Sequence, residues 1–259
     1  MEIRYKNYKY EKQNINFCLN ENTIYGITGT KYKEFLSIFN IINKYTNVTI
    51  NKNKLNNKNI FFYQNKITNI KKINELDIKV EDYLEKIIID YDLQIKNINK
   101  KIEDSLTIVG INKDKKELYI KDLSTSERNL LRVSVSLLFN PEIIILEEPY
   151  FSLDIKNIKR LNILFNRLTD QYNKTIILGS SDSNELYKYT KKMIFISNNN
   201  IVKIGDTKEV YKNVKFLKDN AFDIPESVMF TYNANNKKNI KLDYLQDIRD
   251  TIKDIYKHI

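Results

Sequence analysis

The amino-acid sequence predicts an α/β fold in which a mainly parallel sheet is flanked by helices. Segments rich in β-branched residues alternate with segments of helical periodicity from about residue 23 to residue 204, a pattern typical of parallel, helix-covered sheets. The apolar run at residues 143–146 ends in Glu147 and Glu148. Such a run is typical of a strand buried on both faces, and open α/β sheets bind ligands at the carboxyl ends of their strands. The two acids therefore mark an expected functional edge of the sheet.

Each expected element has a local signal. The N-terminal residues predict short antiparallel strands, and the next strand runs into a glycine turn and a helix. Ser124 and Glu127 have the spacing of a capping box, which predicts that a helix starts there. After residue 213 the pattern changes to helical pieces. The expected strands are residues 3–10, 16–19, 23–27 and 60–63, an acid-bearing strand that begins at 141, and 175–178, 192–196 and 201–204; the expected helices are 33–43, 80–109, 124–139, 155–171, a short one after 178 and an amphipathic one near 242–256.

Composition narrows the classes of function. Lys and Arg outnumber Asp and Glu by 43 to 33 among 259 residues, but the basic residues form no stripe, so we expect no nucleic-acid partner. The single cysteine, Cys18, excludes an internal disulfide, and the single histidine, His258, excludes a histidine base or histidine metal cluster. Because no apolar run approaches the roughly 20 residues that span a bilayer, and the N-terminus is not signal-like, we expect a soluble, intracellular protein.

The turn after residues 23–27 has part of the pattern of a phosphate-binding loop. Such a loop needs G-x-x-x-x-G-K-[ST], in which backbone N–H groups wrap the phosphates, the lysine neutralises their charge and the hydroxyl serves Mg²⁺. Gly26, Gly29 and the following Thr30 are compatible with it. The helix that follows is expected to begin near residue 33.

Three positions of this loop depart from the pattern, and the residue after it is also unfavourable. Lys31 replaces the second glycine, Tyr32 the lysine, and Lys33 the hydroxyl residue. Glu34 follows and competes with a phosphate for the positive end of the helix dipole. Lys31 or Lys33 could substitute for the missing lysine. The alternative, which we favour, is that the loop persists only as a tight turn from strand to helix.

The ordered motifs resemble those of the ATP-binding subunits of ATP-binding cassette (ABC) transporters, over nearly the whole chain. The 19 residues from Leu123 to Pro141 have the length that this family uses between its signature motif and its acid-bearing Walker B strand. The resemblance implies a P-loop NTPase-like cassette at residues 1–212, with a helical signature subdomain at about 66–140. It also implies a helical C-terminal extension at 213–259.

The resemblance also implies a functional role for several individual residues of this sequence. Glu147 stands where an acid holds Mg²⁺, and Glu148 where a glutamate polarises the attacking water. Gln64 stands at the Q-loop glutamine, which also serves Mg²⁺ and belongs to the region that contacts the membrane subunit. The less favoured alternative is an ordinary polar residue at a strand end. Tyr10 stands at the aromatic residue that stacks on adenine, and Asp154 at the D-loop aspartate.

Two further motifs are altered. The family signature has two adjacent glycines where this chain has Thr125 and Ser126, whereas Ser124, which would touch a γ-phosphate, is kept and is followed by Glu127. Ser124 is explained equally well as a helix cap. Ser181 replaces the switch histidine, with Ser180 as a less favoured register, and serine cannot do the histidine's work of orienting the base.

The C-terminal part of the sequence indicates one subfamily within the ABC transporter ATPases. Residues 205–211 (GDTKEVY) and 222–226 (FDIPE) resemble the corresponding region of energy-coupling factor (ECF) transporter ATPases. This resemblance implies ATP and Mg²⁺ as cofactors, although the chain's own loop is poorly suited to them. It also implies a second ABC ATPase, a transmembrane scaffold and a substrate-binding membrane subunit as partners, and a peripheral position at the cytoplasmic face of the membrane.

Three functions remain to be compared. The first is an ATPase subunit of an ECF-type uptake transporter with weak hydrolysis at its own site. The second is a non-catalytic pseudo-ATPase that dimerises with a competent cassette. A soluble ABC protein acting on ribosomes or DNA is disfavoured, because those forms need a second cassette or a long coiled coil that 259 residues do not accommodate.

Overall fold

A six-stranded sheet forms the centre of the molecule in the computed structural model, which describes residues 3–10, 13–20, 22–36, 48–54, 67–69, 72–198, 200–237 and 242–257. The strand order is β10-β9-β3-β8-β7-β6. Neighbouring strands from β9 to β6 are parallel, whereas β10 pairs with β9 in antiparallel fashion. The strands are β3 (Ile24–Gly29), β6 (Ile67–Asn69), β7 (Ile143–Glu147), β8 (Thr175–Gly179), β9 (Lys192–Ser197) and β10 (Asn200–Asp206).

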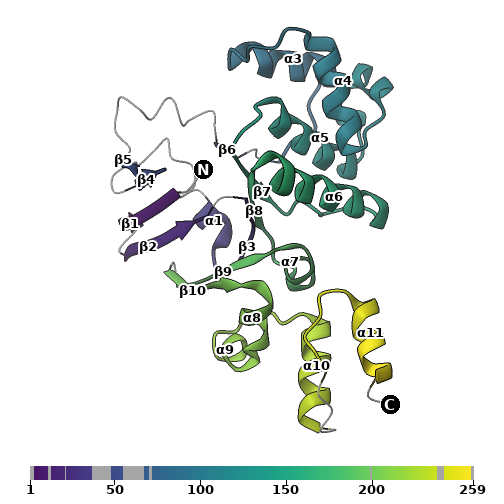
Figure 1. The fold of residues 1–259 in the computed structure, drawn as a ribbon. Helices are drawn as coiled ribbons and strands as arrows, with labels where there is room; N and C mark the ends of the chain where they lie inside the picture. Colours follow the sequence, from purple (N-terminus) through teal and green to yellow (C-terminus); the bar gives the residue numbers. More distant parts are fainter. Residues whose placement is uncertain are drawn as a thin grey trace.

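A second, antiparallel sheet lies beside the first, as Figure 1 shows on its left-hand side. Its order is β2-β1-β4-β5, and the rings of Tyr5 on β1 and Phe17 on β2 stack with centroids 4.4 Å apart. The sequence predicted β1 and β2 but neither β4 nor β5. Its strands are β1 (Ile3–Tyr10), β2 (Gln13–Leu19), β4 (Val48–Ile50) and β5 (Asn53–Lys54).

The central strands are apolar on both faces, and the two faces bury separate cores. In β7, Ile144 and Leu146 join the core under the helices, whereas Ile143 and Ile145 join the core shared with the antiparallel sheet. This division follows from the period-two alternation of side chains along a strand. The uninterrupted apolar run that predicted a doubly covered strand is thereby confirmed.

Helices cover one face of the sheet and extend beyond it as a helical lobe, at the top of Figure 1. The predicted helical segment at 80–109 is divided into two helices, because Asp92 takes a left-handed conformation with φ of 48° and Asn97 caps the second helix. The helices are α1 (Tyr32–Phe35), α3 (Val80–Asp90), α4 (Ile98–Val109), α5 (Thr125–Leu138), α6 (Ile155–Tyr172) and α7 (Ser183–Tyr189), with 3-10 turns at Lys113–Glu117 and Ile120–Asp122.

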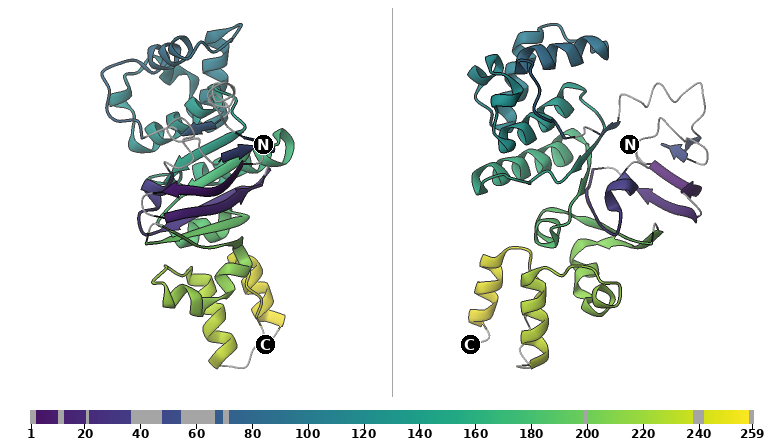
Figure 2. Two further views of the ribbon diagram at one scale, coloured as in Figure 1. Left: turned by 90° about the vertical axis from the view of Figure 1, so that its left-hand side faces the viewer. Right: turned by 180° about the vertical axis from the view of Figure 1, so that it is seen from behind.

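The C-terminal helices lie at the end of the molecule opposite α3 and α4 (Figure 2). Phe222 packs edge-on against Phe195 of β9, with ring centroids 4.8 Å apart. Ser183 Oγ donates a hydrogen bond of 2.7 Å to Asp223 Oδ2, which joins the tail to α7. The helices of this region are α8 (Thr207–Lys212), α9 (Val214–Asp219), α10 (Glu226–Lys237) and α11 (Ile248–Lys257).

The predicted α/β class, the mainly parallel sheet and the N-terminal antiparallel part are confirmed. β6 is an additional strand, and it falls inside the range 66–140 that we assigned to a helical subdomain; the domain boundaries stay a prediction. The helix expected at 33–43 is described only from residue 32 to 36, and the strand expected at 60–63 lies outside the described residues. Among the described residues, none of the helices has the length and apolar character that crossing a bilayer requires.

Candidate functional site at the carboxyl edge of the sheet

The turn between β3 and α1 is drawn toward the neighbouring strand β9. Gly29 has a φ of 116°, and a Cβ atom there would lie 1.9 Å from the carbonyl oxygen of Ile196, so only glycine fits. The backbone N–H of the next residue, Thr30, donates to the same carbonyl at 3.1 Å. Lys31 follows in the left-handed conformation, with φ of 59°. The N–H of Thr30 is thus used within the fold.

Tyr32 occupies the space next to Glu148. Its side chain is buried, with 6% exposed, and its hydroxyl donates a hydrogen bond to Glu148 Oε1. Gly179 makes room for the ring, because a Cβ atom at that residue would lie 3.0 Å from Tyr32 Cε2. Burial, and then the hydrogen bond to Glu148, raise the pKa of Tyr32, so its hydroxyl stays protonated and acts as a donor.

Glu148 is held by three residues from two elements besides its own. Ser180 Oγ donates to Oε2 at 2.8 Å, and both the backbone N–H and the Oγ of Ser181 donate to Oε1 at 3.0 Å. Burial favours a higher pKa, but the hydrogen bonds from Tyr32, Ser180 and Ser181 outweigh it and hold the pKa of Glu148 below its ordinary value. Glu148 is therefore an ionised carboxylate whose oxygens already have donors. Both serine registers considered for the switch position contact it.

The other acid, Glu147, has a cationic partner from the loop. Lys33 Nζ lies 3.2 Å from Glu147 Oε1. Lys33 is the residue predicted at the hydroxyl position of the phosphate loop, and Glu147 is the acid predicted to hold Mg²⁺ at the end of its strand. Glu34, the next residue, has its carboxylate 3.9 Å from Lys31 Nζ. Both expected acid positions thus have partners supplied by the chain itself.

These residues do not fit Mg²⁺ and a triphosphate. The ammonium group of Lys33 lies against the carboxylate of Glu147, and the hydroxyl of Tyr32 donates a hydrogen bond to Glu148. Mg²⁺ prefers an octahedral set of oxygen ligands, and a neighbouring ammonium group repels a cation. The site as folded can orient a carboxylate and a serine pair, but it lacks a phosphate-neutralising lysine at residue 32.

The signature segment forms the predicted helix cap. Glu127 N donates to Ser124 Oγ at 3.2 Å, and Ser124 N donates to Glu127 Oε2 at 3.0 Å, which completes a capping box at the start of α5. Glu127 also pairs with Lys115. Thr125 is exposed and Ser126 half-buried. The cap prediction is confirmed; a role for Ser124 at a nucleotide stays a prediction.

The remaining predicted residues are dispersed. Asp154 caps α6, its Oδ1 accepting a hydrogen bond of 2.7 Å from Asn157 N. Gly26 lies inside β3, where it pairs with Leu178 and Met193. Tyr10 ends β1, but its side chain and the whole of Gln64 lie outside the described residues. The structure therefore brings together Tyr32, Lys33, Glu147, Glu148 and Ser181, and leaves Tyr10 and Gln64 untested.

One buried charged residue was missed by the sequence analysis. Arg132 of α5 is 0% exposed, and all three of its guanidinium nitrogens lack a hydrogen-bond partner among the described residues. Burial lowers the pKa of Arg132 to about 10, an effect that Glu147 and then Glu148 oppose, so the group stays charged at neutral pH. The available signal was an arginine between Leu131 and Val133, on the apolar side of a predicted helix.

Comparison with known proteins supports the cassette fold. The chain matches no protein-family model. It is 32% identical over 130 residues to the energy-coupling factor transporter ATP-binding protein EcfA2 of Staphylococcus aureus, covering 50% of this chain and 45% of that protein. The EcfA2 protein of Enterococcus faecalis is 29% identical over 141 residues, covering 54% and 47%. The chain thus spans about half the length of the curated relatives it matches.

Solved structures match over more of the chain. The cbiO1 protein of Clostridium perfringens, described as part of the ABC transporter complex cbiONQ, superposes with a TM-score of 0.66 at 16% identity, over 89% of this chain and 98% of that one. A nucleotide-free ATP-binding cassette from an ABC transporter gives 0.69 at 15% identity, over 85% and 98%. The chain has the fold of an ABC cassette, and its sequence resembles ECF transporter ATP-binding proteins.

Proposed function

We propose that this chain is an ABC-type subunit of an ECF-like uptake transporter whose own phosphate loop does not sustain ATP hydrolysis. One observation carries the proposal: both acids have a partner from the predicted loop. Tyr32 donates a hydrogen bond to Glu148, and Lys33 forms an ion pair with Glu147. A lysine and a hydroxyl group stand at these loop positions in a competent site. The non-catalytic cassette is therefore favoured over the weakly hydrolysing one.

In this proposal the chain pairs with a partner cassette and contributes its signature segment to the partner's nucleotide site. ABC cassettes pair head to tail, so the signature segment at Ser124 would face the nucleotide of a partner cassette. ATP and Mg²⁺ would then be held by a partner with an intact G-x-x-x-x-G-K-[ST] loop. This chain would close with that partner and transmit the movement to a membrane scaffold and its substrate-binding subunit. Its place would be the cytoplasmic face of the membrane, held there by these partners.

Direct titration of the isolated chain with Mg-ATP tests the proposal. We expect no heat of binding at micromolar nucleotide, because the loop offers no lysine at residue 32 and Thr30 N is bonded to Ile196 O. Micromolar affinity would instead assign the chain an active nucleotide site. Co-expression with a cassette that has an intact loop is the second arm. Recovery of a stable one-to-one complex supports a heteromeric subunit, and failure to form it contradicts the partner assignment.

A further inference from the structure

A small cationic pocket lies beside the site just described. It has a volume of about 70 Å³ and is enclosed by α5, by the segment that leads into α3 and by the turn after β7. The residues that line it are Lys72, Ile73, Thr125, Arg128, Asn129, Arg132, Glu148 and Phe151. Three of these are cations and one is an acid. Since about 10–15 Å³ of such space holds one water molecule, the pocket has room for an anion of several atoms.

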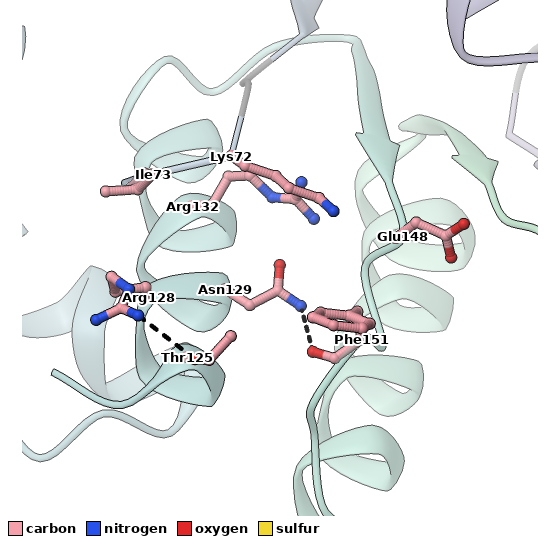
Figure 3. A pocket seen from close by; sticks show the side chains of 8 residues that line it. All are labelled: Lys72, Ile73, Thr125, Arg128, Asn129, Arg132, Glu148 and Phe151. Carbon is pink, nitrogen blue, oxygen red and sulfur yellow. Dashed lines mark hydrogen bonds between the residues drawn. The ribbon is translucent and has the colours of Figure 1, made fainter. Parts of the chain in front are cut away.

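Arg132 is the buried cation of this pocket. Figure 3 shows its guanidinium and the ammonium end of Lys72 extending into the space between α5 and the strand end that carries Glu148. Neither Glu147 nor Glu148 accepts a hydrogen bond from Arg132. Glu147 pairs instead with Lys33, and Glu148 accepts from Tyr32, Ser180 and Ser181. A buried charge without a hydrogen-bonded counterion is costly. The five N–H donors of Arg132 have no acceptor within the described part of the chain.

The other polar groups of the pocket have defined partners. Arg128 donates to the carbonyl of Leu123 at 2.5 Å and to Glu75 at 3.3 Å, so it is already committed. Asn129 Nδ2 donates to the carbonyls of Pro149 and Phe151 at 2.9 and 3.0 Å, which fixes the wall opposite Arg132. Lys72 lies over the ring of Phe151, with Nζ 5.2 Å from its centroid. The pocket thus presents one buried guanidinium that lacks a partner among the described residues and one exposed ammonium group.

We propose that this pocket binds a phosphate-class oxyanion, with Arg132 as its main ligand and Lys72 as the second. A planar guanidinium donates two parallel hydrogen bonds to phosphate oxygens, and an anion with two negative charges neutralises both cations. Thr125 Oγ1, which accepts from Arg128 at 3.4 Å, can direct its own hydrogen into the pocket. The inference does not rest on the proposed function, since neither of the proposed ligands, Arg132 and Lys72, belongs to the predicted phosphate loop.

Thermal unfolding at constant ionic strength tests the site with inorganic phosphate as the probe. We expect the wild-type midpoint to rise by several degrees between sodium chloride and 50 mM sodium phosphate, because a ligand that binds only the folded state stabilises it. Arg132→Met should abolish the phosphate-dependent rise, and Lys72→Met should reduce it. Lys86→Met, a lysine on α3 outside this pocket, is the matched control and should keep the full rise. A rise in Arg132→Met equal to the wild-type rise would overturn the proposal.

Two further readouts keep the test decisive. Removal of the buried, unpaired charge should raise the midpoint of Arg132→Met in chloride, so a folded variant is expected; if it fails to fold, Lys72→Met alone decides, since Lys72 is exposed. The unfolding midpoint measured with ATP or ADP in sodium chloride distinguishes a nucleotide phosphate from free inorganic phosphate. A midpoint rise with inorganic phosphate assigns the free ion, and a rise with nucleotide alone that Lys72→Met reduces assigns a nucleotide phosphate. No rise with either probe would refute the site.

Discussion

Lys33 Nζ lies 3.2 Å from Glu147 Oε1, so the residue predicted at the hydroxyl position of the phosphate loop supplies a cation to this acid. Just over half of the Lys33 side chain is exposed, and such an ion pair contributes little to stability by itself. The effect of this ion pair is confined to the two acids at the sheet edge. Together with the hydrogen bond from Tyr32 to Glu148, it gives each of the two adjacent carboxylates a partner from α1.

The first prediction concerns restoration of the loop. In the triple variant Lys31→Gly, Tyr32→Lys and Lys33→Ser, both acids are released and a lysine and a hydroxyl stand at their usual positions. Glycine also suits residue 31, which has a φ of 59°. We expect Mg-ATP affinity to rise by about 10- to 100-fold, corresponding to one charge-assisted interaction of about 1.5–3 kcal/mol. Calorimetric titration of both proteins measures this, and unchanged affinity would show that residues 31–33 are not the loop positions assigned to them.

The second prediction concerns the Tyr32 hydroxyl. Tyr32→Phe removes one donor from the half-buried carboxylate of Glu148, and we expect the free energy of unfolding in urea to fall by about 1–2 kcal/mol. Tyr256→Phe, at a tyrosine that is 76% exposed, should change it by less than about 0.5 kcal/mol. In the background of Glu148→Gln the cost of Tyr32→Phe should shrink. Equal costs in both backgrounds would mean that the Tyr32 hydroxyl does not stabilise the fold through its bond to the Glu148 carboxylate.

The third prediction follows from Glu185 on α7. Burial, and then the neighbouring charge of Asp182, raise the pKa of Glu185 to about 7, although a hydrogen bond from Ser180 opposes this. The raised pKa means that the folded state holds this proton more tightly than the unfolded state does. The contribution of Glu185 is therefore most favourable below about pH 4.5, and it is lost as pH rises toward 7.

Glu185→Gln removes this pH dependence. At pH 8 the variant should be more stable than the wild type by up to about 3 kcal/mol, and near pH 4.5 the two should be similar. Urea unfolding at several pH values measures the difference. Glu209→Gln, at an exposed glutamate of α8, is the control and should show no such pH-dependent gain. A Glu185 variant that is less stable than the wild type at pH 8 would refute the assignment.

Local signals in the sequence predicted much of this site, and long-range contacts account for the rest. The capping box of Ser124 and Glu127 depends on residues three apart, and the sheet edge at Glu147 depends on one apolar strand, so both could be inferred. The bond between Tyr32 and Glu148 joins residues 116 apart and depends on room left by Gly179. No local pattern encodes that contact. Arg132 had a local signal, but only packing decides whether a buried arginine finds a partner.

The division at Asp92 shows the same limit within the helical lobe. The apolar period continues from α3 into α4, so periodicity alone predicts one helical segment. The aspartate that takes a left-handed φ and the cap at Asn97 end the first helix and start the second. Both residue types are typical of such breaks, and reading them would have separated the helices.

The last prediction concerns which nucleotide site hydrolyses ATP when this chain pairs with a second cassette. Consider a complex with a partner cassette whose motifs are intact. Glu148→Gln should change ATP turnover little there, because Tyr32 already hydrogen-bonds to Glu148 and Lys33 pairs with Glu147, so we expect no hydrolysis at this chain's own site. Ser124→Arg should reduce turnover and transport sharply, since it adds bulk and charge where the partner's nucleotide would lie. Ser124→Ala is the control, because it removes the cap of α5, at a cost of about 1 kcal/mol, without adding bulk. Turnover of the purified complex measures all three, and a large loss from Glu148→Gln with little effect of Ser124→Arg would make this chain's own site the working one.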